Sequence, residues 1–174
     1  CESALHISLA QSIIKPDKMD FAIQKSVELG ISQFQPIISQ RSVVRVGQDK
    51  LKKKQEHWQA VAISACEQSG RTRVPVVLPT LSLEQWLDET KATDATRIIL
   101  APGDHPRINK LKTPQTNHTE FKLIIGPEGG FSEEETQLCI KKGVTAVSMG
   151  PRILRAETAC LAATALLQQH FGDL

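Results

Sequence analysis

The sequence predicts a single α/β domain built on a mainly parallel β-sheet with helices on both faces. The chain has 174 residues, a length that suits one domain with one core. Short apolar runs without polar alternation recur along it, and such runs are typical of strands that are buried on both faces. Segments of helical length with capping signals separate these runs, which is the order expected of parallel strands joined by crossover helices.

The elements expected in the first half are apolar segments bounded by turn residues: a strand at 5–9, a helix at 18–29, a strand at 34–38 and a helix from 49 to 70. Gly30 stands where a left-handed C-cap usually ends a helix. Pro36 interrupts the second run, which therefore predicts a short buried or edge strand. Asp49 is the expected N-cap of the long amphipathic helix, and Gly70 ends that helix.

The second half continues the same alternation, with an apolar run at 74–78, a helix at 82–90, strands at 98–101, 121–125 and 144–149, and helices at 132–143 and 156–170. Ser132 and Glu135 form a capping box, which fixes the start of the helix that they open. Residues 102–120 are polar and predict a loop.

Composition excludes several classes of protein. The chain has 21 Lys plus Arg against 19 Asp plus Glu and 40% hydrophobic residues, as in an ordinary soluble globular protein. No apolar run approaches the ~20 residues of a membrane span, and the net charge of +2 does not by itself indicate nucleic-acid binding. The four cysteines form neither a CxxC pair nor a set with His at metal-ligand spacing. This pattern predicts reduced thiols in a cytosolic protein.

Three loops follow predicted strand ends, after Ala101, Ile125 and Met149, and ligands bind at such loops in open α/β sheets. The second loop reads IGPEGGFSEEE and holds three glycines within five residues, which permits close approach of backbone to a ligand. It lacks the lysine and spacing of a P-loop and is not GxGxxG. Glu128 and the three acidic residues at 133–135 repel phosphate and tolerate a cationic ligand.

The third loop reads MGPRILRAETA and places Arg152 and Arg155 just before an alanine-rich helix. Arg155 either pairs with a carboxylate at the helix start or acts on a ligand. The helix is apolar nearly all round between residues 156 and 167, so it must be buried on more than one side. A partner subunit is the economical explanation.

Taken with KMDFAIQKSVELGI at 18–31 and EQSGR at 67–71, these two loops resemble the RsmE family of bacterial 16S ribosomal RNA (uracil N3) methyltransferases, which belongs to the SPOUT class. The resemblance covers residues 15–174 and implies a SPOUT domain there, with a C-terminal trefoil knot and a homodimeric state. Residues 1–14 would be the end of an interdomain linker and the first strand. The chain begins with Cys rather than Met, so we expect it to start inside a longer product; the PUA-like N-terminal β-barrel of the family is absent from it.

The resemblance also implies S-adenosylmethionine as cofactor. This ligand carries a sulfonium cation and no phosphate, which suits glycine loops that lack a cationic clamp. The residues expected to bind it are Leu100, Ala101, Gly126, Pro127, Glu128, Gly129, Gly130, Met149, Gly150, Ile153 and Leu154. For Ile153 and Leu154 the alternative is ordinary core packing.

Methylation of uracil N3 requires the loss of an imide proton, which spreads negative charge over two ring carbonyls. A guanidinium stabilises such charge but is a poor base, so Arg155 is the candidate for transition-state stabilisation. Glu157 or a water is the candidate proton acceptor, although Glu157 could instead hold Arg155 in place. No metal is needed.

The expected partner is 16S ribosomal RNA or the small ribosomal subunit, in the cytoplasm and away from membranes. Between Arg41 and Arg73 there are 8 basic and 3 acidic residues. The strongest candidates for RNA contact flank predicted strand ends, and they are Arg41, Arg45, Arg71 and Arg73. Two alternatives stay open: a non-catalytic RNA-binding or ribosome-assembly module, and a SPOUT methyltransferase acting on transfer RNA or on a ribose hydroxyl.

Overall fold

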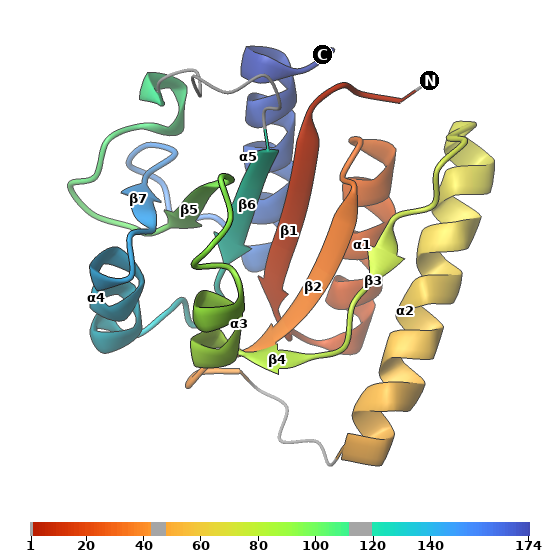
Figure 1. Cartoon of the computed structure of the whole chain (residues 1–174), viewed down its shortest axis with the longest axis horizontal. Coiled ribbons are helices and arrows are strands. Elements are labelled where there is room, and N and C mark those ends of the chain that lie inside the picture. The colour runs from red at the N-terminus through yellow and green to blue at the C-terminus, as the bar shows by residue number, and fades with distance from the viewer. Residues whose placement is uncertain (1, 43–47, 112–119) are drawn as a thin grey trace.

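The computed structural model describes residues 2–42, 48–111 and 120–174 of the chain (Figure 1). The strands are β1 (His6–Ser12), β2 (Gln33–Ile38), β3 (Val76–Val77), β4 (Leu81–Ser82), β5 (Thr96–Leu100), β6 (Glu120–Ile125) and β7 (Thr145–Val147). The helices are α1 (Pro16–Glu28), α2 (Gln48–Ser69), α3 (Leu83–Glu89), α4 (Glu133–Lys141) and α5 (Ala156–Phe171), with a 3₁₀ turn, η1, at Ile108–Lys110.

The strands form one sheet in the order β3-β2-β1-β6-β5-β7, and β4 also pairs with β2. Each of these pairings is parallel, which confirms the predicted sheet type. β1 lies in the middle of the sheet between β2 and β6, so it is part of the same folded unit as the elements that follow it.

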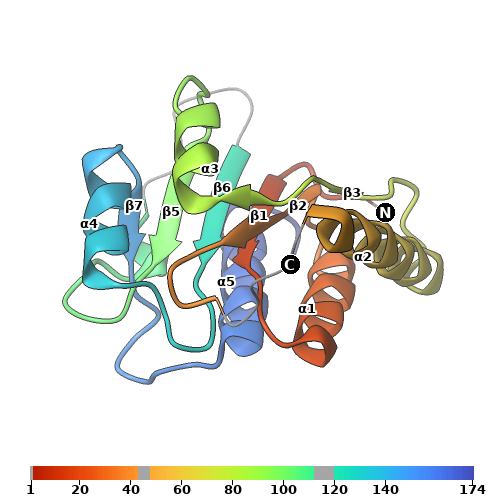
Figure 2. The same cartoon turned by 90° about the horizontal axis from the view of Figure 1, so that it is seen from below.

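Helices cover both faces of the sheet, as predicted. α1, α2 and α5 lie on one face, and α3 and α4 lie on the other (Figure 2). Each face has its own apolar core: Phe34 and Phe121 belong to the first, and Trp86 and Ile124 to the second. Because a parallel sheet is buried on both faces, its strands carry the uninterrupted apolar runs from which they were predicted.

Local boundaries differ from prediction at a few residues. α1 begins at Pro16, because a proline at the first helical position lacks only an N–H that the helix would leave unpaired. Asp49 lies inside the first turn of α2 rather than at its N-cap. Pro36 is buried within β2, where β3 pairs with residues 33–34 and β4 with residues 37–38; the proline thus falls between the two outer partners.

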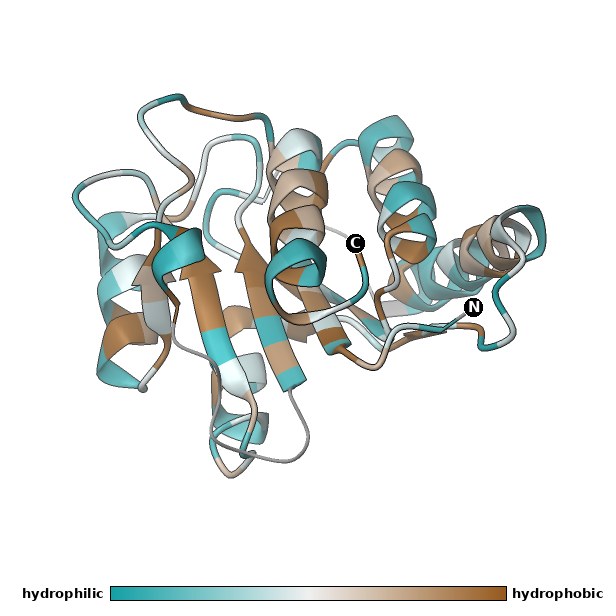
Figure 3. Cartoon of the chain, turned by 90° about the horizontal axis from the view of Figure 1, so that it is seen from above, coloured by the Kyte–Doolittle hydropathy of each residue, from teal (hydrophilic) through white to brown (hydrophobic). Residues whose placement is uncertain are grey.

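The last helix presents two different faces. Its fully buried side includes Cys160, Ala163 and Leu167, which pack into the core against α1 and the sheet. A second stripe of apolar residues is only half-buried, and it consists of Leu161, Ala162, Ala165 and Leu166. Figure 3 shows the apolar character of this helix between its more polar ends.

Burial makes the described cysteines unreactive. Cys66, Cys139 and Cys160 are free and buried, and burial raises the pKa of both Cys139 and Cys160 to about 12. Within the described part of the chain, no three His, Cys, Asp or Glu side chains gather closely enough to hold a metal ion. A search of the same residues finds no helix with the length and apolarity to cross a membrane.

Candidate active site

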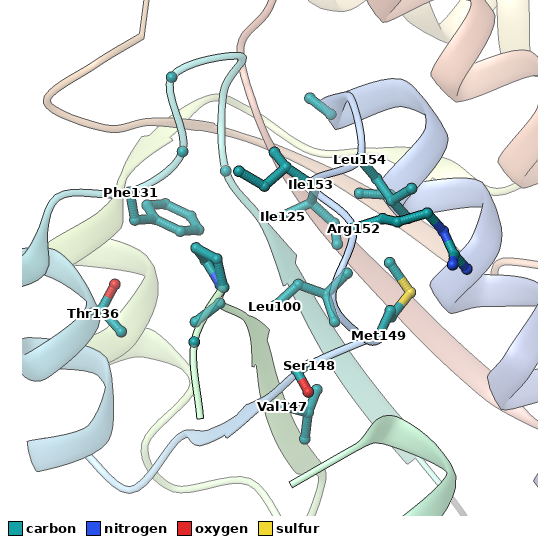
Figure 4. Close-up of a pocket in the computed structure, with 18 of the residues that line it drawn as sticks. Leu100, Ile125, Phe131, Thr136, Val147, Ser148, Met149, Arg152, Ile153 and Leu154 are labelled. Atoms are coloured by element: carbon teal, nitrogen blue, oxygen red, sulfur yellow. The ribbon is translucent and has the colours of Figure 1, made fainter. Parts of the chain in front are cut away.

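A cavity of about 520 Å³ opens at the carboxyl ends of β5, β6 and β7 (Figure 4). The three loops singled out in the sequence meet there, because parallel strands end at the same edge of the sheet. All eleven residues expected to bind a cofactor line this cavity, including Ile153 and Leu154. Ile153 is 91% exposed, so core packing does not explain it.

The cavity also has walls that sequence reasoning missed. Phe131 closes the side formed by the second loop, opposite the predicted Ile153 of the third loop (Figure 4). Thr136 comes from α4, and Val147 and Ser148 come from the end of β7. The sequence could have signalled Phe131, which directly follows the third glycine, but it held no signal that Thr136 turns toward the loop.

The second loop is shaped by its glycines. At Gly126 a side-chain Cβ would lie 3.1 Å from the Phe131 nitrogen and 3.2 Å from its ring, so a side chain there would push Phe131 aside. Gly130 has a φ of 66°, in a region that L side chains rarely adopt. The loop therefore closes on itself in a way that other residues would resist.

Two contacts fasten this loop to the start of the chain. The Gln11 amide donates to the Gly126 carbonyl at 3.2 Å, from the end of β1. The Lys15 backbone N–H donates to Glu128 Oε1 at 3.1 Å. Glu128, which was expected to favour a cationic ligand, thus also ties the glycine loop to the connection between β1 and α1.

The first and third loops are joined through Ser148. Its N–H donates to the Pro106 carbonyl at 2.9 Å, and its carbonyl accepts from the Ile108 N–H at 2.9 Å. Its hydroxyl donates to the His105 carbonyl at 2.9 Å. The segment after β5 therefore lies alongside the segment after β7, with Arg107 and Ser148 forming a parallel bridge.

Arg155 and Glu157 have contrasting surroundings at the start of α5. Arg155 is exposed just before the helix, and its guanidinium has no hydrogen bond or ion pair with any residue that the structure describes. Glu157 is only 6% exposed and lies 3.4 Å from the Lys18 ammonium on α1. The alternative in which Arg155 pairs with a carboxylate at the helix start is therefore not found among the described residues. Glu157 pairs instead with Lys18, a residue that the sequence analysis did not single out.

The candidate RNA contacts separate into different environments. Arg73 has an exposed side chain, whereas Arg41 hydrogen-bonds the glycine loop, with its Nη1 donating to the Gly129 carbonyl at 2.9 Å. Arg45 lies outside the described residues.

Arg71 was expected to be accessible to RNA, but its side chain is only 8% exposed and is hydrogen-bonded within the chain. It donates to the Val27 and Ile31 carbonyls at 2.9 and 2.8 Å and pairs with Glu2 at 2.8 Å. The geometry makes Arg71 an anchor within the fold rather than a free cation for RNA.

Sequence comparisons identify close relatives of the chain. The sequence model of the RNA methyltransferase domain matches residues 1–168. Ribosomal RNA small subunit methyltransferase E of Buchnera aphidicola (subsp. Schizaphis graminum) is 40% identical over 173 residues, which are 99% of this chain and 69% of that protein. The Bacillus subtilis protein of the same name is 34% identical over 164 residues, which are 92% of this chain and 64% of the relative. The chain thus spans about two thirds of the length of these curated relatives.

Solved structures of similar proteins superpose closely on the chain. Ribosomal RNA small subunit methyltransferase E from Neisseria gonorrhoeae, crystallised bound to S-adenosyl methionine, superposes with a TM-score of 0.92 at 42% identity, covering 100% of this chain and 70% of the other. A Legionella pneumophila protein solved in complex with the same cofactor gives a TM-score of 0.92 at 39% identity, over 99% of this chain and 69% of the other.

Proposed function

The chain belongs to the RNA methyltransferase domain family, and from that membership we propose that it transfers a methyl group from S-adenosylmethionine to N3 of a uridine in 16S ribosomal RNA. The observation that carries the proposal is the cavity at the carboxyl edge, where all eleven predicted cofactor residues meet. Relatives named as small-subunit ribosomal RNA methyltransferases and neighbours solved with S-adenosylmethionine support it.

The residues present suit this cofactor. The volume of about 520 Å³ lies in the range of small-molecule sites. Apolar side chains and glycine backbone make up most of the wall, and Arg152 is the one basic side chain among the described lining residues, so no phosphate clamp is built there. Main-chain groups of the three loops would hold the adenosine, with Ile153 and Leu154 against its faces. When bound, S-adenosylmethionine supplies an electrophilic methyl group.

We assign charge stabilisation to Arg155. As the N3 proton leaves, negative charge spreads over the two uracil carbonyl oxygens, and a guanidinium presents fixed donors to such charge. Arg155 is exposed next to the cavity wall at Leu154 and Ala156, and it is free of competing partners among the described residues. It can therefore turn toward a base that enters from solvent.

Glu157 has a different role in this proposal. Its carboxylate is buried and paired with Lys18 at 3.4 Å, which fastens the start of α5 to α1. A carboxylate already engaged in this way is poorly placed to receive a proton from an incoming base. We therefore assign Glu157 to positioning of the helix start that carries Arg155, and the imide proton to a water.

The SPOUT-type knot is also part of the proposal. In support, the segment after β5 is bonded across Ser148, and α5 then contacts η1 on its way to the face of the sheet that carries α1. Close contact between these segments just before α5 is what a threaded C-terminal end would require. Because the substrate is ribosomal RNA, we place the enzyme in the cytoplasm.

We further propose a homodimer that covers the half-buried stripe of α5. Ala165 lies on this stripe, whereas Ala163 is fully buried within the chain's own core. Ala165→Glu should therefore give the mass of one chain in light scattering, where the wild type gives twice that mass at micromolar concentration. A wild type with the mass of one chain would remove the dimer from the proposal.

Calorimetry followed by nucleoside analysis tests the proposed reaction. S-adenosylmethionine should bind the chain, and 16S RNA incubated with both should yield N3-methyluridine by mass spectrometry. Binding without methylation would favour the RNA-binding module, and methylation of another nucleoside would favour a methyltransferase with a different RNA target. Absence of cofactor binding would contradict the proposal as a whole.

A further inference from the structure

Arg41 was expected to contact RNA, but its side chain lies on the glycine loop. Its Nη1 donates to the Gly129 carbonyl at 2.9 Å and, at 3.4 Å, to the Phe131 carbonyl. Both acceptor residues line the cavity. We propose that Arg41 is a positioning residue that holds this rim of the pocket in the shape that binds S-adenosylmethionine. The inference rests on the proposed function, since it assigns a role within the cofactor site.

The turn that carries Arg41 is itself firmly built. The Ser39 N–H donates to the Ser42 hydroxyl at 3.0 Å, and the Ser42 N–H donates to the Ser39 carbonyl at 3.0 Å. The Gln40 N–H donates to Glu135 Oε1 at 2.7 Å. The guanidinium therefore reaches the loop from a fixed base at the end of β2.

Glu135 connects this turn to the far end of the same loop. While its Oε1 accepts from Gln40, its Oε2 accepts from the Ser132 N–H at 2.9 Å in the capping box of α4. The carboxylate is 6% exposed. The segment from Gly129 to Ser132 is thus held by Arg41 at Gly129 and Phe131, and by Glu135 of α4 at Ser132; through Gln40, Glu135 also ties it to the turn after β2.

A glycine loop gains more from such support than other loops do. Glycine has the widest conformational freedom of any residue in the unfolded or open state, so an unsupported loop must lose that freedom when a ligand binds. A charged donor to a carbonyl is stronger than a neutral one. By fixing two carbonyls before the ligand arrives, Arg41 lowers the cost of binding.

The side-chain geometry favours support of the loop over a purely electrostatic role. A Cβ added at Gly129 would lie 3.5 Å from Arg41 Cδ and 3.7 Å from its Cβ, so the arginine stem runs along the loop at van der Waals distance. A residue that only attracted RNA would need neither this stem contact nor two carbonyl acceptors.

Calorimetric titration with S-adenosylhomocysteine tests the inference, with Arg41→Ala, Arg41→Gln and a control, Lys141→Ala. Lys141 is an exposed cation on α4, the helix that the loop feeds. Arg41→Ala should raise the Kd about tenfold, the scale of one lost charged hydrogen bond. Arg41→Gln should recover part of the affinity, because its amide can donate to the same carbonyls, and the control should match the wild type.

Amide resonances provide the second measurement. The Gly129, Gly130 and Phe131 N–H signals should shift in Arg41→Ala and stay in place in Lys141→Ala. If the wild type binds and Arg41→Ala binds equally well, the inference is overturned while the proposed function stands; an RNA affinity with a shallower salt dependence in that variant would then make Arg41 a phosphate contact. If the wild type itself does not bind, the proposed function has failed first.

Discussion

At the amino ends of the strands, Arg71 is enclosed by protein, whereas at the carboxyl ends Arg155 is exposed to solvent. Arg71 follows the long helix α2, and four hydrogen bonds hold its guanidinium to Glu2, Val27 and Ile31. Arg155 precedes α5, and no described residue accepts a hydrogen bond from its side chain. The same residue type therefore serves as an anchor at one end of the sheet and remains available for a ligand at the other.

The two arginines differ because burial decides whether a guanidinium must have a partner within the chain. A buried guanidinium must be paired, because an unpaired buried charge is very costly, and Arg71 meets that condition within the chain. An exposed guanidinium is hydrogen-bonded to water, so the absence of a protein partner costs little free energy. At the carboxyl edge, where the loops of the ligand site lie, the Arg155 donors are free among the described residues, while at the amino edge the Arg71 donors are engaged within the chain.

The largest expected effect in this comparison comes from Arg155→Ala. It should lower the single-turnover rate of RNA methylation by ~10²-fold or more, the scale lost when one donor to a developing oxyanion is removed. Cofactor affinity and the melting temperature should stay near those of the wild type, since the side chain holds no described residue in place. A wild-type rate at saturating RNA would remove Arg155 from the catalytic machinery.

At the amino edge, Glu2→Gln should instead change stability. The hydrogen bond from Arg71, helped by the Thr72 and Arg73 N–H groups, lowers the pKa of Glu2 from 4.5 to about 2. A carboxyl with a lowered folded-state pKa stabilises the fold above its unfolded pKa and loses that contribution as the pH falls through the folded pKa. Because Glu2 lies near the surface, water screens its charge, and at pH 7 we expect Glu2→Gln to cost only ~1 kcal/mol of unfolding free energy.

Denaturant unfolding at several pH values checks this expectation. The difference in unfolding free energy between wild type and Glu2→Gln should decrease as the pH falls below 4.5 toward 2. Glu120→Gln is the matched control, because its carboxylate, which pairs with Lys122 at 2.9 Å, is 41% exposed and should contribute only ~0.5 kcal/mol. If the difference in unfolding free energy between wild type and Glu2→Gln does not change with pH, the charge of the carboxylate does not contribute to the contact between Glu2 and Arg71.

The sequence was sufficient for the architecture because the deciding signals are local. Apolar runs located every described strand except β4, and Ser132 with Glu135 marked the start of α4 through a capping box that the structure contains. Strand ends then located the pocket, since parallel strands bring their loops to one edge. Gly30 and Gly70 ended their helices as predicted, with φ values of 86° and 68°.

The partners of individual charged side chains could not be predicted in the same way. Arg71 and Glu2 are 69 positions apart, and Lys18 reaches Glu157 from a helix at the other end of the chain. No periodicity links such residues, because only the assembled fold brings them together. The free state of Arg155 and the anchored state of Arg71 were therefore indistinguishable as sequence.

At the carboxyl edge, Gly126→Ala tests whether the pocket depends on a close turn. The new methyl would lie 3.1 to 3.3 Å from the Phe131 and Gly130 backbone, so the loop must shift. Overpacking of this kind costs ~1–3 kcal/mol, and we expect the Kd for S-adenosylmethionine to rise about tenfold.

Gly129→Ala is the matched control for this change. A Cβ there would meet Arg41 at 3.5 Å, an ordinary contact distance, so the loop need not shift and the rise in Kd should be smaller than for Gly126→Ala. Equal losses for the two variants in calorimetry would show that the loop is sensitive to any side chain rather than to crowding at Phe131.

The smallest effect is expected for Arg73→Ala. Arg73 is two residues from the anchor, but only its backbone is engaged, with its N–H donating to Glu2 at 2.9 Å and its carbonyl accepting from Cys66. If the exposed side chain contacts an RNA phosphate, removing it should make the slope of log affinity against log salt shallower by about one contact. Melting temperature and single-turnover rate should not change. Filter binding at several salt concentrations measures the slope. A slope identical to that of the wild type would leave Arg73 outside the RNA interface, so that neither Arg71 nor Arg73 would touch substrate.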